Sequence, residues 1–169
     1  MASEPSPAKF YPSGRFHVPI ERSRREIRVL ILLPGTWTDP IKCDMYTVSL
    51  DDDQKYETLS YVWGKSSDTK PIILHGEERQ VTLNLEAALR HLRSPIENIN
   101  IWVDAVCINQ TDDEEKSHQV ALMGEIYARC DHCRIILGCP AAYFSSDNYA
   151  DQSLLQECTL LLSVHLNVI

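Results

Sequence analysis

The sequence has 169 residues, of which 44% are hydrophobic and 24% are charged, and its formal net charge at pH 7 is −8. This length and composition are typical of one globular domain. The negative charge argues against binding to nucleic acid or to an anionic membrane, since both need a positive protein surface. The longest purely apolar run, residues 29–33, is far shorter than the ~20 residues that span a membrane. We therefore expect no nucleic-acid partner and no membrane insertion.

Residues 1–25 are rich in Pro, Ser and Arg and show no periodicity, so we expect a disordered lead-in. This segment has no apolar stretch before a small-residue cleavage site, so it is not a signal peptide, and we expect a cytoplasmic protein. The folded domain is expected to occupy residues 26–169. Because residues 166–169 are largely apolar, we also expect the domain to be incomplete at its C-terminal end.

The first half of the domain is predicted to be rich in strands. Apolar runs at residues 27–33, 43–50 and 56–62 end at Pro-Gly, Asp-rich or Gly-containing turns, which is typical of buried strands. Residues 71–82 are predicted to form a β-hairpin around residues 75–78. We therefore expect a strand-rich extension at the N-terminal side of the domain.

In the second half, helices are predicted to alternate with strands. Residues 85–93 have helical spacing of apolar side chains, and Asn84 is a suitable N-cap. Residues 99–108 are expected to form a central strand covered on both faces.

A second predicted helix covers residues 113–130, where Thr111 and Glu114 fit a capping box. Its apolar face is expected to contain Val120, Met123, Ile126, Tyr127 and Cys130.

The last predicted elements are a buried strand at residues 134–138 and a helix at residues 151–166. Strands that alternate with helices pair in parallel through right-handed crossovers. The sequence therefore predicts an α/β fold with a mainly parallel sheet flanked by helices.

Several common site motifs are absent or incomplete. The last three residues of a phosphate-binding loop, Gly-Lys-Ser, are present at positions 64–66. However, Leu59 occupies the position where that loop requires its first glycine. Cys130 and Cys133 have the spacing of a zinc-binding pair, but no second pair completes four ligands. We expect buried thiols here and no metal site.

Two segments, residues 56–64 and 102–110, place polar and aromatic residues where predicted strands end. In open α/β sheets, ligands bind at the carboxyl ends of parallel strands. For each polar residue alone, helix capping or turn formation is an equally good explanation. The candidate binding or motif residues are Ser60, Tyr61, Trp63, Gly64, Trp102, Asp104, Asn109, Gln110 and Gln119.

The same segments resemble the fungal heterokaryon incompatibility (HET) domain. The resemblance covers nearly all of residues 26–138 and is carried by residues 27–30, 33–35, 39–41, 56–64, 102–110, 112, 115, 119–120, 123, 126–127 and 137–138. It implies an intracellular module of fungal nonself recognition whose activation triggers growth arrest or programmed cell death. It also implies a remote similarity to Toll/interleukin-1 receptor (TIR) domains, and hence a TIR-like or flavodoxin-like arrangement.

Three functions are compatible with this resemblance. The first is a signalling module that self-associates or binds protein partners. The second is a TIR-like NAD glycohydrolase, in which NAD is the substrate, Glu115 or Glu57 is the catalytic carboxylate, and Trp63 or Tyr61 stacks on nicotinamide. The family's third block, built around Trp, Arg and a Gln-Glu pair, has no counterpart in this chain, which favours the first function. The third is an inactive, shortened fragment.

Overall fold

The computed structural model describes residues 9–10, 16–136 and 161–164. The strands are β1 (Lys9–Phe10), β2 (Glu26–Leu32), β3 (Lys42–Ser49), β4 (Glu57–Tyr61), β5 (Thr69–Leu74), β6 (Glu77–Thr82), β7 (Ile99–Trp102), β8 (His132–Ile136) and β9 (Leu161–Val164). The helices are the 3₁₀ helix η1 (Arg22–Arg24), α1 (Leu83–Leu92), α2 (Asp104–Cys107) and α3 (Asp113–Arg129).

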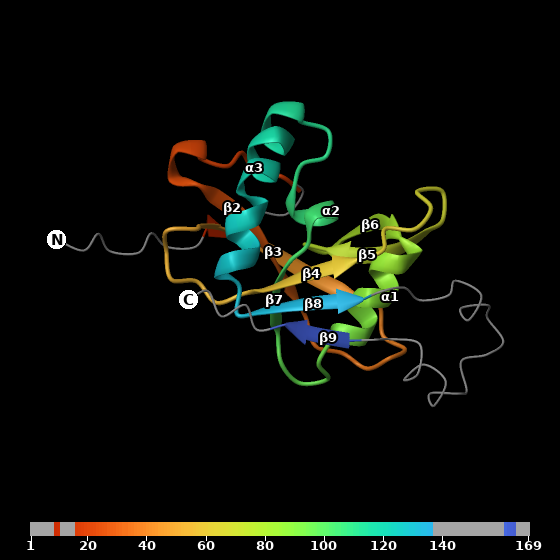
Figure 1. Ribbon diagram of the computed structural model, residues 1–169. Helices are drawn as coiled ribbons and strands as arrows, with labels where there is room; N and C mark the ends of the chain where they lie inside the picture. The colour runs from red at the N-terminus through yellow and green to blue at the C-terminus, as the bar shows by residue number, and fades with distance from the viewer. Residues whose placement is uncertain (1–8, 11–15, 137–160, 165–169) are drawn as a thin grey trace.

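All nine strands form one mixed sheet in the order β6-β5-β3-β2-β7-β4-β8-β9, and β1 also pairs with β3. Three pairings are parallel, namely β3 with β5, β4 with β7 and β4 with β8. The other five are antiparallel; Figure 1 shows β4 and β8 pointing the same way and β9 running against them. The α/β class is confirmed, whereas the expected mainly parallel sheet is not.

Two of the five antiparallel pairings join strands that follow each other closely in the chain, and one of these is the β-hairpin predicted for residues 71–82. β2 and β3 follow each other without a helix, and β5 joins β6 through His75 and Gly76, which both have positive φ. A connection this short can only join antiparallel strands. Strand β2 then pairs with β7 in the antiparallel direction as well, so it separates the two parallel parts of the sheet.

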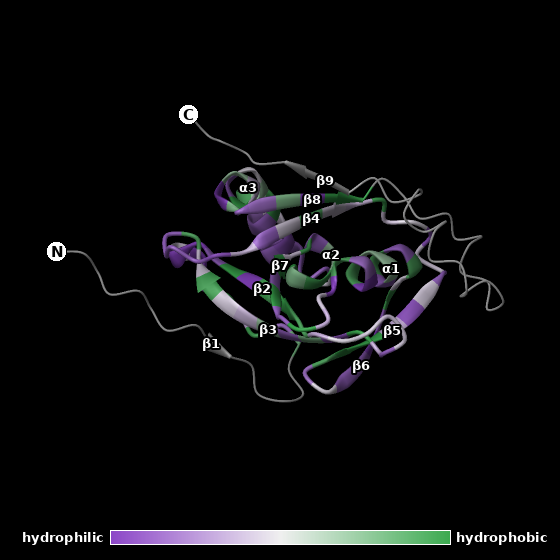
Figure 2. Ribbon diagram, turned by 90° about the horizontal axis from the view of Figure 1, so that it is seen from below, coloured by the Kyte–Doolittle hydropathy of each residue, from purple (hydrophilic) through white to green (hydrophobic). Residues whose placement is uncertain are grey.

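The core lies around β2, which is buried along almost its whole length. Figure 2 shows the sheet curving so that α1 and α2 lie on its concave side, between β4 and β5. Helix α1 buries Leu85, Ala88 and Leu89 there, which is the face that its helical spacing predicted. Helix α3 contributes Ile126 to the same core.

Both helix N-caps differ from the predicted residues. Thr82 caps α1, accepting a hydrogen bond from the Leu85 backbone N–H, while the Asn84 side chain donates to the Val62 carbonyl. Asp112 caps α3, accepting from the backbone N–H groups of Glu114 and Glu115. The two predicted capping residues are engaged elsewhere: Asn84 by the distant Val62 carbonyl, and Thr111 by the neighbouring Asn109 side chain.

The predicted strand at residues 99–108 is wrong in its second half. Strand β7 ends at Trp102, and α2 follows, where the Asp104 carboxylate accepts a hydrogen bond from the Ala105 N–H at 2.7 Å. The Cys107 N–H then bonds to the Val103 carbonyl at 2.8 Å, which closes a helical turn.

The predicted apolar face of α3 is also partly wrong. Val120 is 51% exposed, whereas the polar residues Glu115 and Gln119 are buried beside Ile126. These two side chains form hydrogen bonds with Arg28 and with the Glu26 carbonyl of β2. A pattern of apolar residues could not reveal that face, because two of its three buried members are polar.

The terminal segments differ from expectation as well. Residues 161–164, predicted to be helical, form β9, and the rest of the predicted helix at 151–166 lies outside the described residues. Within the expected disordered lead-in, β1 pairs with β3 and the His17 ring contacts the Val106 carbonyl at 3.1 Å. Parts of residues 1–25 are therefore placed against the domain.

Candidate functional site

The candidate site lies where β4 and β7 end. These strands are parallel neighbours, with Thr58 opposite Trp102, so their carboxyl ends meet at one edge of the sheet. Trp63 follows β4 by two residues, and Asp104 follows β7 by two residues. Trp63 and Asp104 therefore lie at the same edge of the sheet, where the Asp104 carboxylate accepts a hydrogen bond from the Trp63 side chain.

Asp104 is a partly buried carboxylate. Burial raises its pKa above the ordinary value, and hydrogen bonds from the Ala105 N–H and from the Trp63 side chain act in the opposite direction. The Tyr61 and Tyr127 side chains lie within electrostatic range, and burial followed by the Asp104 charge raises the pKa of each to about 12. Both phenols are therefore neutral near pH 7, and they can only donate or accept hydrogen bonds.

The turn that carries Trp63 depends on Gly64, whose φ is +75°. A Cβ atom at this position would lie 2.8 Å from Asn84 Nδ2, the atom that donates to the Val62 carbonyl. Residues other than glycine are strained at such a φ. Gly64 and Asn84 together therefore hold the loop that places Trp63 beside Asp104.

The other polar candidates support this edge of the sheet. The Gln110 side chain donates to the Asp104 carbonyl at 2.9 Å, which fixes the turn after α2. The Asn109 side chain accepts from the Thr111 N–H and hydroxyl, as in an Asx turn. Ser60 lies one residue before the end of β4, opposite Ile135 of β8.

Trp102 and Gln119 belong to the interior. Trp102 is completely buried, and its ring meets the Tyr127 ring edge to face, with 5.8 Å between the centroids. Gln119 is buried too, and its amide donates to the Glu26 carbonyl at the start of β2 at 3.0 Å. Neither side chain is available to a ligand at the surface.

Glu115, a candidate catalytic carboxylate, is held in a buried ion pair with Arg28 of β2. The Arg28 and Glu115 side chains are 0% and 6% exposed. Arg28 donates through both terminal nitrogens, with Nη2 at 2.8 Å from Oε2, and the Asn109 N–H donates to Oε1 at 2.8 Å. Burial alone would raise the pKa of Glu115, but these hydrogen bonds outweigh it and lower the pKa. Glu115 therefore stays ionised and fully engaged.

Arg28 also ties the N-terminal segment and α2 to the sheet. Its Nη1 donates to the Cys107 carbonyl at 3.0 Å, and its Nη2 donates to the Val18 carbonyl at 2.8 Å. One guanidinium thus satisfies acceptors from three separate parts of the chain. These contacts give the Arg28–Glu115 pair a structural role.

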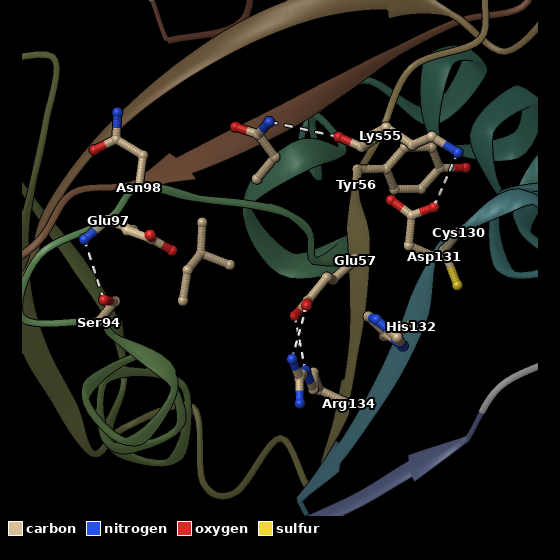
Figure 3. A pocket seen from close by; sticks show the side chains of 12 residues that line it. Lys55, Tyr56, Glu57, Ser94, Glu97, Asn98, Cys130, Asp131, His132 and Arg134 are labelled. Carbon is tan, nitrogen blue, oxygen red and sulfur yellow. Dashed lines mark hydrogen bonds and ion pairs between the residues drawn. The ribbon is translucent and has the colours of Figure 1, made fainter.

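Glu57, the other candidate carboxylate, lies at the opposite, amino end of β4 and forms a bidentate ion pair with Arg134 of β8. Arg134 donates to the two Glu57 carboxylate oxygens at 2.7 and 2.8 Å, and these hydrogen bonds raise the pKa of Arg134. Figure 3 shows this pair on the wall of an open pocket of about 730 Å³. The pocket's charged side chains have both signs: Lys55, Glu57, Glu97, Asp131 and Arg134. Glu57 is therefore remote from Trp63 and Asp104.

We expect the Glu57→Gln substitution to lower the free energy of unfolding by less than about 1 kcal/mol, because exposed or partly exposed ion pairs contribute little. The Glu57 and Arg134 side chains are 19% and 30% exposed, so water screens their charges. Urea denaturation of wild type and variant measures the difference. A loss above about 3 kcal/mol would contradict this expectation and show that the pair behaves as a buried one.

In the part of the chain that the structure describes, no three His, Cys, Asp or Glu side chains are grouped as a metal site would require. Cys130 contacts the Thr58 hydroxyl and the Tyr127 carbonyl, and Cys133 is buried in β8. Burial raises the pKa of Cys130, which disfavours the thiolate that metal binding needs.

Sequence reasoning missed the arginine partners of both carboxylates. Arg28 lies 87 positions from Glu115, and Arg134 lies 77 positions from Glu57. A signal for Arg28 was present, since it is the single charge inside the apolar run from Ile27 to Leu33. A charge in a buried strand requires a partner of opposite sign.

The sequence model described as "Heterokaryon incompatibility protein (HET)" matches residues 56–163. The chain is also 38% identical, over 126 residues, to heterokaryon incompatibility protein 6, OR allele, of Neurospora crassa. The aligned region covers 66% of this chain and 18% of that relative, so the chain spans less than a fifth of the relative's length. No solved structure matches the chain.

The family match agrees with the resemblance carried by residues 56–64 and 102–110. It begins at Tyr56 and so leaves out β2 and β3, although both strands lie in the same sheet as the matched part. Arg28 of β2 pairs with Glu115 inside the matched region, so the two parts form one structural unit. The chain belongs to the heterokaryon incompatibility (HET) family.

Proposed function

We propose that this chain acts in fungal heterokaryon incompatibility as a cytoplasmic signalling and interaction module of nonself recognition, whose activation leads to growth arrest or programmed cell death. The observation that supports it most is the family match over residues 56–163, together with the name of the Neurospora relative. In the described part of the chain, no helix has the length and apolar character needed to cross a membrane.

Binding is favoured over NAD hydrolysis as the action of this module. A glycosidic bond is cleaved with a carboxylate that reaches the substrate as acid, base or nucleophile. Glu115 is enclosed by Arg28 and Asn109, and Glu57 is clamped by Arg134 at the far end of β4. Trp63, in contrast, is 49% exposed, as a residue at a binding surface would be.

The test is inducible expression of the whole chain in a filamentous fungus, with colony growth and uptake of a vital dye as readouts. We expect induction to slow growth and increase dye uptake. The Val120→Ala variant, changed at an exposed position on α3, should behave as wild type, and Trp102→Ala, changed in the core, should lose the effect. Unchanged growth while wild-type protein accumulates would contradict the proposal.

A further inference from the structure

Two of the four strongly exposed large hydrophobic residues in the described part of the chain are neighbours, Val62 and Trp63. Trp63 is not a loose side chain, because its indole N–H interacts with Asp104 and its backbone is held by the turn at Gly64. An aromatic ring that is already ordered loses little conformational entropy when a partner covers it. The exposed ring therefore forms a rigid platform at the carboxyl edge of the sheet.

Asp104 lacks the kind of partner that the other two carboxylates have. Glu57 and Glu115 each form a bidentate pair with an arginine, whereas no ion pair joins Asp104 to any Arg, Lys or His that the structure describes. A carboxylate that is partly removed from water without a cation loses solvation free energy that an incoming cation can restore. The neighbouring Tyr61 and Tyr127 phenols are neutral and cannot supply that charge.

A guanidinium group fits the exposed Trp63 ring and the Asp104 carboxylate better than other cations do. It is planar and weakly hydrated, so it stacks on an indole face while its N–H groups donate to a carboxylate. A lysine ammonium is strongly hydrated and offers no planar face. The net charge of −8 further favours a partner that presents basic side chains.

We propose that Trp63 and Asp104 form a docking site for an arginine side chain of a protein partner, with Val62 contacting an apolar neighbour of that arginine. This inference rests on the proposed role as an interaction module and names the partner chemistry that the module recognises. The arginine stacks on the half-exposed Trp63 ring and donates to Asp104. The contact resembles the Glu115–Arg28 pair inside the domain, with the arginine supplied from outside.

The test follows the three indole N–H signals of the ¹⁵N-labelled whole chain while the peptide acetyl-Gly-Leu-Arg-Leu-Gly-amide is added. The Trp63 signal is identified by its absence from the Trp63→Phe variant. We expect this signal to shift saturably with the arginine peptide. It should shift far less with the lysine version and not at all with the citrulline version, which is uncharged. Asp104→Asn should weaken arginine binding about tenfold, since a charge-assisted hydrogen bond is lost.

The Val120→Ala variant is the matched control, because it changes an equally exposed apolar residue on α3 and should leave the titration unchanged. Equal binding of arginine and citrulline peptides, or unchanged affinity in a folded Asp104→Asn protein, would overturn the docking site. If the arginine peptide does not bind but expression still slows growth, the docking site alone is refuted. If the arginine peptide binds as expected but expression does not slow growth, the result counts against the signalling role alone.

Discussion

Substituting Glu115 by Gln is expected to lower the free energy of unfolding by about 3–5 kcal/mol, since it leaves a buried charge without its counterion. The uncompensated charge would be that of Arg28, whose side chain is completely buried. The new amide also presents N–H groups to Arg28 and to the Asn109 N–H, which are both donors. Urea denaturation at neutral pH measures the loss.

The double variant Arg28→Met/Glu115→Met is the control for this prediction. It removes both charges, so it should be more stable than Glu115→Gln although it lacks the ion pair. A Glu115→Gln protein as stable as wild type would contradict the structural role and return Glu115 to the list of catalytic candidates.

The same pair predicts how stability depends on pH. Because the folded-state pKa of Glu115 is lowered, its ionisation stabilises the fold above the unfolded pKa, ~4.3, and this contribution is lost as the pH falls through the folded pKa. The stability difference between wild type and Glu115→Gln should therefore be largest near neutral pH and shrink below about pH 4. A difference that is constant from pH 7 to pH 3 would contradict the assignment.

The second large effect is expected at Trp102. Substitution by Ala should lower the free energy of unfolding by about 3–5 kcal/mol, as for other large aromatic side chains in protein cores. Trp102 is completely buried, and the loss would leave a cavity against the Tyr127 ring. Trp102→Phe keeps much of the volume and should cost less than half as much.

Trp63→Ala provides the comparison for Trp102, because it removes the same side chain from a site that is 49% exposed. It should cost less than about 1 kcal/mol, as is usual for surface substitutions. Equal losses at the two tryptophans, measured by denaturant unfolding, would contradict the distinction between a core residue and a surface platform.

Local patterns predicted much of the fold. The apolar runs gave the positions of β2, β3 and β4, and helical spacing gave α1 and α3 to within two residues of the observed bounds. The sequence placed Trp63 and Asp104 after predicted strands, but their meeting depends on the parallel pairing of β4 with β7, which the sequence did not assign. The family was predicted from the resemblance over nearly all of residues 26–138, and the family match confirms it.

The features that were missed depend on contacts distant in sequence. Asn84 and Thr82 are both capable N-caps, and the Val62 carbonyl, 22 positions from Asn84, decided which of them caps α1. The polar face of α3 depends on Arg28 and Glu26, which lie far from it in the sequence. Strand β2 pairs with β7 in the antiparallel direction, and the paired residues Ile31 and Asn100 lie 69 positions apart in the sequence. No local periodicity encodes such pairings.

NAD turnover tests most directly whether this HET-family module acts by binding, with Glu57 and Glu115 as structural carboxylates. The purified chain, shown to be folded by a cooperative melting transition, is incubated with NAD at high protein concentration, and nicotinamide release is followed. Glu57→Gln serves as the matched variant because we expect it to fold normally. The structure predicts no release from either protein. Release by wild type that disappears in a folded Glu57→Gln protein would contradict it and identify Glu57 as catalytic.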